Sequence, residues 1–135
     1  MNDAELLEQF ESCRLGVEAW THEAHIRIAY LYLRALGFSA ALSRMRAGIR
    51  AYNAAHARRE GPLEGYHETI TQAWLRIVDA TLRHYGPGED SADFCRRQPH
   101  LLSRTLLRLF YTRDRLCHPP AKTEFVEPDL ATLPT

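Results

Sequence analysis

Hydrophobic residues recur along most of this chain at spacings of three and four, which is the period of an α-helix. Alternation of apolar and polar residues, which is typical of β-strands, is not sustained anywhere in the sequence. The pattern predicts helices over residues 3–13, 39–57, 91–97 and 101–111, a helix that begins between 17 and 21 and ends at 37, and a helix from 67 or 69 to 85. We therefore expect an all-α fold, a single-domain bundle of about five or six helices.

Two of these helices are expected to lie at the centre of the bundle. Between residues 26 and 36 only two residues, both arginines, are charged, so this helix is apolar on nearly every side. The helix that ends at 85 confines its polar side chains to one stripe. Thr21 is the predicted N-cap of the first of the two, and Gly37 follows its C-terminus. Thr69 begins a capping-box pattern that favours a start of the second at residue 69.

The length and the breaks in the pattern predict one domain over residues 1–135. A chain of 135 residues has the usual size of a single domain. Glycine and proline mark loops at 58–65 and 86–88. Prolines recur between 118 and 135, so this part is expected to form an extended Pro-rich tail.

The charge and the apolar runs narrow the classes of partner, and the cysteines indicate the cellular compartment. The 17 basic and 17 acidic residues balance, which argues against a dedicated nucleic-acid binder. No apolar run approaches the roughly 18 residues that span a bilayer, so no membrane partner is expected. The cysteines Cys13, Cys95 and Cys117 are widely spaced and form no C-x-x-C pair, which favours a reducing cytoplasm. Arginine almost replaces lysine, as GC-rich bacterial genomes favour. We expect a cytoplasmic bacterial protein with a small-molecule ligand, and whether it forms a homodimer stays open.

Candidate chemistry lies in two segments, each at the start of a long helix. These are Trp20-Thr21-His22-Glu23-Ala24-His25 and Gly65-Tyr66-His67-Glu68-Thr69-Ile70-Thr71. On a helix, residues three apart have Cβ atoms about 5–6 Å from one another, so His22 and His25 point the same way, toward the interior. A helix N-terminus disfavours imidazolium, and neutral imidazole is the form that binds a metal ion.

The second segment supplies a third histidine. Helical geometry points His67 inward if the helix already includes it, and this argument lapses if the helix starts at Thr69. Three histidines and a bound water are typical of a catalytic site for a divalent metal ion, Zn or Fe-like. Because such an ion acidifies its water, His22, His25 and His67 predict a small metal-dependent enzyme, a hydrolase or a related enzyme of small molecules.

Other residue types would complete such a site. Glu11 and Glu68 are the candidate catalytic carboxylates, and which of them belongs to the site stays open. Glu68 is expected on the solvent side of its helix, which favours a surface role, and Glu23 is an alternative that points away from the histidines. The side chains expected to contact substrate are Trp20, Tyr52, Tyr66 and Thr71.

The same histidines allow a different function. The pattern H-x-x-H alone is a weak signal, because histidines in a core also hydrogen-bond to backbone carbonyls or tyrosine hydroxyls. The alternative is a non-catalytic ligand-binding or interaction module with a metal-free, histidine-lined polar cleft. A third interpretation is a plain helical scaffold. Phosphate-loop, dinucleotide, hydrolase-elbow and H-E-x-x-H motifs are absent from the sequence.

The two histidine segments resemble those of a family of small uncharacterised bacterial helical proteins. The segments 10–13, 50–53, 111–116 and 126–130 are similar as well, so that the resemblance covers nearly the whole chain. The family has no assigned activity, and the resemblance therefore implies neither a reaction nor a role for any residue.

Overall fold

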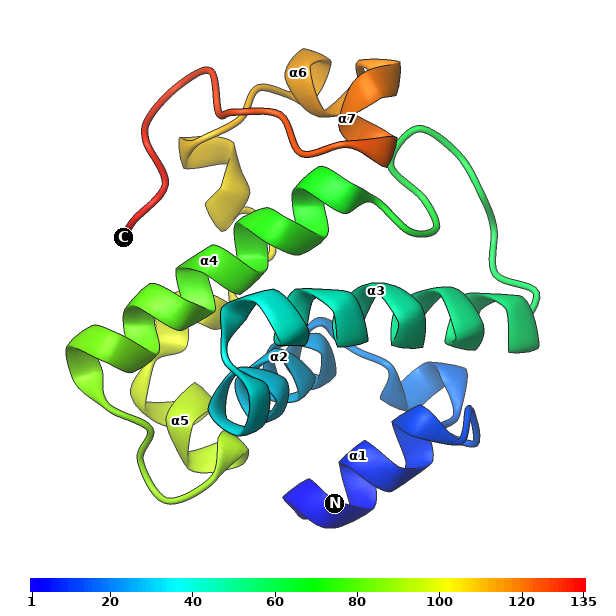
Figure 1. The fold of residues 1–135 in the computed structure, drawn as a ribbon, viewed down its shortest axis with the longest axis vertical. Coiled ribbons are helices and arrows are strands. Elements are labelled where there is room, and N and C mark those ends of the chain that lie inside the picture. The colour runs from blue at the N-terminus through cyan, green and yellow to red at the C-terminus, as the bar shows by residue number, and fades with distance from the viewer.

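The structure, a computed structural model, describes residues 1–135 and consists of helices and loops without a β-strand. This confirms the predicted all-α, single-domain fold. The elements in chain order (Figure 1) are α1 (Asp3–Glu11), η1 (Val17–Ala19), α2 (His22–Leu36), α3 (Phe38–Ala55), α4 (Glu68–Tyr85), α5 (Ser91–Arg97), η2 (Pro99–Leu102), η3 (Leu106–Leu109), α6 (Arg113–Cys117) and α7 (Pro119–Thr123), where η denotes a 3₁₀-helix.

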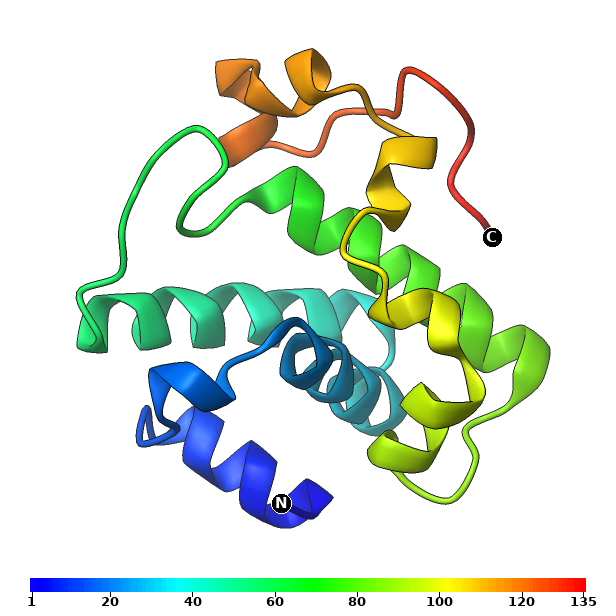
Figure 2. The same ribbon diagram turned by 180° about the vertical axis from the view of Figure 1, so that it is seen from behind.

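Helix α2 has the ends that the sequence predicts. The hydroxyl of Thr21 accepts the N–H of Ala24 at 3.2 Å, as an N-cap does. Gly37 ends the helix at φ 80°, where glycine carries no steric penalty, and α3 follows at once. Both ribbon views show α2 between α1 and α5 (Figures 1 and 2), and it also packs against α3 and α4. Its buried side chains are Ala24, Ile26, Ile28, Ala29, Tyr30, Tyr32 and Leu33.

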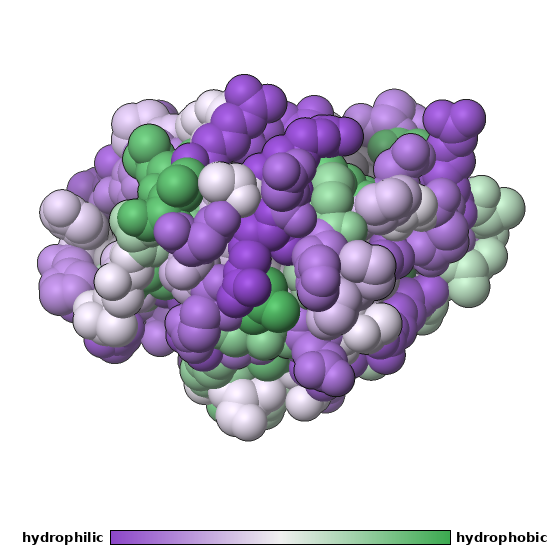
Figure 3. Space-filling model, turned by 90° about the horizontal axis from the view of Figure 1, so that it is seen from above, coloured by the Kyte–Doolittle hydropathy of each residue, from purple (hydrophilic) through white to green (hydrophobic).

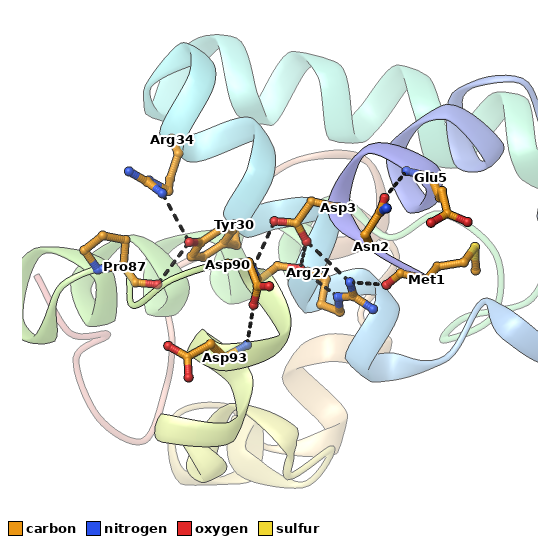
Figure 4. Close-up of polar contacts among 11 residues, drawn as sticks. Met1, Asn2, Asp3, Glu5, Arg27, Tyr30, Arg34, Pro87, Asp90 and Asp93 are labelled. Atoms are coloured by element: carbon orange, nitrogen blue, oxygen red, sulfur yellow. Dashed lines mark hydrogen bonds and ion pairs between the residues drawn. The ribbon is translucent and has the colours of Figure 1, made fainter.

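Hydrogen bonds and an ion pair connect the short N-terminal helix α1 to α2 and to the start of α5 (Figure 4). Arg27 of α2 donates from Nε to the hydroxyl of Ser91 at 2.7 Å and from Nη2 to the Met1 carbonyl at 2.8 Å. Asp3 accepts hydrogen bonds from both the backbone N–H and the hydroxyl of Ser91. The start of α5 therefore joins α1 and α2 through side chains that are all paired.

The start of α4 differs from the predicted capping box. The N-cap is His67, whose Nδ1 accepts the N–H of Ile70 at 3.1 Å. Thr69 is instead fully buried, and its hydroxyl lies 2.7 Å from the Ala121 carbonyl oxygen and 2.9 Å from that of Glu124. It also accepts the N–H of Val126 at 3.1 Å. The capping-box prediction was wrong because Thr69 binds the C-terminal segment, which local sequence cannot reveal.

The chain after α5 is less regular than predicted. The expected helix over 101–111 is split into η2 and η3, because Ser103 and Thr105 interrupt it and pair with one another at 3.2 Å. The tail is not wholly extended, since Pro119 and Pro120 open the short helix α7. Residues 124–135 have no regular structure. The face that carries α6 and α7 is largely hydrophilic, with separate hydrophobic patches (Figure 3). No helix combines the length and the apolar stretch that crossing a membrane requires.

Candidate functional site

A cleft of about 1460 Å³ opens where four parts of the chain meet. Its walls come from the start of α2, the second half of α3 with the loop that follows, the first half of α4, and the η2–η3–α6 segment. Half of the lining residues are hydrophobic, and most of the others are arginines, histidines and small polar residues. A large concave site with apolar walls and a few polar groups is the usual form of a small-molecule site.

His22 and His25 both line this cleft, as the sequence predicts for residues three apart. His22 Nε2 lies 2.8 Å from the Leu101 carbonyl oxygen, and His25 Nδ1 lies 2.7 Å from that of Thr21. A carbonyl oxygen only accepts, so these two nitrogens carry the protons. His22 Nδ1 and His25 Nε2 are therefore left as unprotonated nitrogens without a protein partner.

Both imidazoles are neutral at pH 7. Burial lowers the pKa of His25 to about 4, against the hydrogen bond to Thr21, and the charges of Arg58 and Arg104 lower it further. Burial also lowers the pKa of His22, and Arg104 acts in the same direction. Arg58 follows α3 and Arg104 lies between η2 and η3, so two cationic side chains reach the surroundings of His25 from separate walls.

The arginines of the cleft differ from the other arginines of the chain. Outside the cleft, each guanidinium has a carboxylate, a hydroxyl, a carbonyl or an aromatic ring as its partner. The five that line it, Arg58, Arg59, Arg104, Arg108 and Arg113, have no such partner. The two glutamates of the lining, Glu23 and Glu64, form no ion pair with them. The cleft thus carries an uncompensated positive charge.

His67 lies outside the lining of the cleft, although it is buried. Its Nε2 donates to the Leu116 carbonyl oxygen at 2.9 Å, and its Nδ1 accepts the N–H of Ile70. Both nitrogens are thus occupied, and His67 does not fit the role of a metal ligand. The structure contains no group of three or more His, Cys, Asp and Glu side chains that could hold a metal ion. The three-histidine centre remains a prediction that the geometry does not support.

Glu68 is buried, with only 6% of its surface exposed, so its expected position on the solvent side was wrong. Arg46 of α3 donates from Nε and Nη2 to its two oxygens, each at 2.8 Å, and Tyr66 Oη donates to Oε1 at 2.8 Å. Arg46 holds the pKa of this carboxyl below its usual range. The angular argument failed because it treated α4 alone, whereas Arg46 reaches Glu68 from the neighbouring helix. Neither Glu68 nor Tyr66 lines the cleft.

The remaining predicted site residues fall into two groups. Trp20 and Thr71 line the cleft. Glu11 and Tyr52 do not line it. Glu11 accepts the Tyr32 hydroxyl at 2.6 Å and pairs with an exposed arginine of α3, and Tyr52 is buried and donates to the Leu15 carbonyl oxygen at 2.8 Å. Glu11 thus connects α1 to α2 and α3, and Tyr52 connects α3 to the loop that follows α1.

Sequence reasoning missed Arg58 and Arg104 as site residues. One signal could have found Arg104: residues 98–113 include three arginines and no acidic residue. Arg104 therefore has no acidic residue within four positions along the chain with which to pair. No protein-family model matches the chain, and neither a curated protein nor a solved structure matches it.

Proposed function

We propose that this protein binds a small anionic molecule in the cleft, with Arg58 and Arg104 as cationic contacts beside His22 and His25. The observation that carries the proposal is the partition of the arginines, since only those of the cleft lack a partner. A guanidinium that is free of carboxylates can form two parallel hydrogen bonds to a carboxylate or a phosphate of a ligand.

The N-terminus of α2 adds to the attraction of the cleft for an anion. Trp20, Thr21, His22 and Glu23 line the cleft, so the N-terminus of a 15-residue helix borders it. The dipole of such a helix places partial positive charge at this end. The apolar half of the lining would bury the uncharged part of the ligand.

Binding of anions at low ionic strength tests the proposal, because salt screens exposed charges. Calorimetric titrations with benzoate and inorganic phosphate should show saturable one-site binding of at least one of them. Arg104→Gln should weaken that binding about 10-fold or more, since it removes a charge-assisted hydrogen bond. Arg83→Gln is the matched control, because Arg83 is an exposed arginine outside the cleft that pairs with Asp79. Equal losses in both variants, or no saturable binding of either anion, would contradict the proposal.

A metal-dependent enzyme is the second candidate. The observation that favours it is the pair of fixed tautomers, since metal-bound histidines commonly donate their other ring N–H to a backbone carbonyl. His22 and His25 would then be two ligands, without His67. Elemental analysis of protein purified without an affinity tag tests this candidate: about one divalent ion per chain, lost in His22→Ala and His25→Ala, would support it.

A further inference from the structure

Three aromatic rings form a column that leads from the core to the cleft. Phe10 of α1 stacks on Trp20 with ring centroids 4.5 Å apart and an interplanar angle of 23°. Trp20 stacks on His25 with centroids 3.7 Å apart and an angle of 25°. Phe10 and Trp20 are buried, whereas His25 is only partly buried and lines the cleft. His25 is therefore the end of the column that a ligand can reach.

Only part of the His25 ring is used by the protein. Trp20 covers one face, and the Nδ1 edge is held by the Thr21 carbonyl. The second face and the Nε2 edge have no aromatic or hydrogen-bonding partner in the chain. The hydrogen bond and the stack together fix the orientation of the ring, so the face that points away from Trp20 is oriented before a ligand arrives.

We propose that the anion bound in the cleft carries a flat aromatic ring, which stacks on the face of His25 that points away from Trp20 while its anionic group pairs with Arg58 and Arg104. This inference rests on the proposed function and names its class of ligand. Aromatic carboxylates and aromatic nucleotides share this chemistry. An offset stack contributes to affinity beyond the area that it buries, whereas a saturated ring of the same size gains only the burial.

The rest of the cleft can accept such a ring. Ile26 of α2, Met45 and Ile49 of α3 and Trp74 of α4 all line it, which gives the cleft apolar surface from three helices. Trp74 packs edge-on against His22, with centroids 4.7 Å apart. The two histidines of the cleft are thus each held by a tryptophan.

A matched pair of ligands tests the inference. Benzoate and cyclohexanecarboxylate carry the same charge and similar volumes, and only benzoate can stack. Calorimetry should show benzoate binding about 2- to 10-fold more tightly. In NMR titrations, the carbon-bound ring protons of His25 should move upfield with benzoate and not with cyclohexanecarboxylate. Adenosine monophosphate against ribose 5-phosphate is the second pair, and it shows whether nucleotides rather than carboxylates are the better ligands.

Two variants separate stacking from charge. His25→Phe keeps an aromatic face, so the preference for benzoate over cyclohexanecarboxylate should persist. His25→Leu should abolish the preference, because benzoate binding weakens toward that of cyclohexanecarboxylate. Equal affinities for both members of each pair, without a ring shift at His25, would overturn the aromatic inference while anion binding stands. No binding of any of the four anions would overturn the proposed function as well.

Discussion

At the start of α4, His67 and Glu68 are buried, and both ring nitrogens and both carboxylate oxygens have partners within the protein. At the start of α2, His22 and His25 are only partly buried, and each keeps one ring nitrogen without a protein partner. In sequence the two starts are alike, since each places a histidine directly before a glutamate. The two starts differ instead in how deeply their side chains are buried and in how completely these side chains are hydrogen-bonded.

The difference is one of hydrogen-bond satisfaction. A buried polar group that is fully paired stabilises one conformation and has no free capacity for a ligand. Unpaired donors and acceptors beside a cleft exchange water for ligand groups at little cost. The start of α4 is therefore a structural joint that connects α4 to α3 and to the end of α6, and the start of α2 is where we propose that a ligand binds. Substitutions at the two helix starts test whether their roles differ in this way.

The largest effect is expected at the joint. Arg46→Met leaves Glu68 buried without its cationic partner, which should lower the free energy of unfolding by about 3–5 kcal/mol. Urea denaturation measures this loss. Arg46→Met combined with Glu68→Met should recover most of the stability, because no charge then remains buried. If Arg46→Met alone were as stable as the wild type, the ion pair between Arg46 and Glu68 would not stabilise the start of α4.

The next largest effect is a dependence of the stability on pH, which is caused by His25 in the cleft. The pKa of His25 is about 4 in the folded protein and near 6.5 when unfolded, so the unfolded chain binds more protons between these values. Stability should fall by on the order of 3 kcal/mol from pH 6.5 to 4. His25→Asn should remove this part of the pH dependence, as denaturation at several pH values would show. A slope that persists unchanged in the variant would mean that other groups cause it.

A smaller loss is expected from Thr69→Val, which keeps the shape of the side chain and removes its hydroxyl. The carbonyl oxygens of Ala121 and Glu124 and the N–H of Val126 would lose a buried partner. The free energy of unfolding should fall by about 2 kcal/mol. Hydrogen exchange at the Val126 amide should accelerate more than exchange within α2. Uniform acceleration throughout the protein would contradict a local role for Thr69.

The smallest change in stability is expected where the change in binding is largest. Arg104→Gln should alter the free energy of unfolding by no more than about 0.5 kcal/mol, because Arg104 is exposed and has no partner to lose. Denaturation of this variant beside Arg46→Met gives the comparison directly. A loss at Arg104 as large as that at Arg46 would show that Arg104 is part of the scaffold.

The helices could be predicted because their signals are local: the helical period, the Thr21 cap and Gly37 all lie within one element. The proximity of His22 and His25 could be predicted for the same reason. The surroundings of His67 could not, since its partner Leu116 comes from a distant segment whose path depends on tertiary packing. Arg58 lies far along the chain from Arg104, and nothing local predicts that both approach His25.

Arginine-selective NMR spectra that detect Nε and Cζ test the central claim most directly. During titrations with benzoate and with inorganic phosphate at low ionic strength, the signals of Arg58 and Arg104 should shift with one common saturating curve for at least one of the two anions. The Arg46 signal should stay fixed, because its guanidinium already pairs with Glu68. With both anions, small non-saturating shifts spread over all exposed arginines, or unchanged Arg58 and Arg104 signals, would contradict an anion site in the cleft.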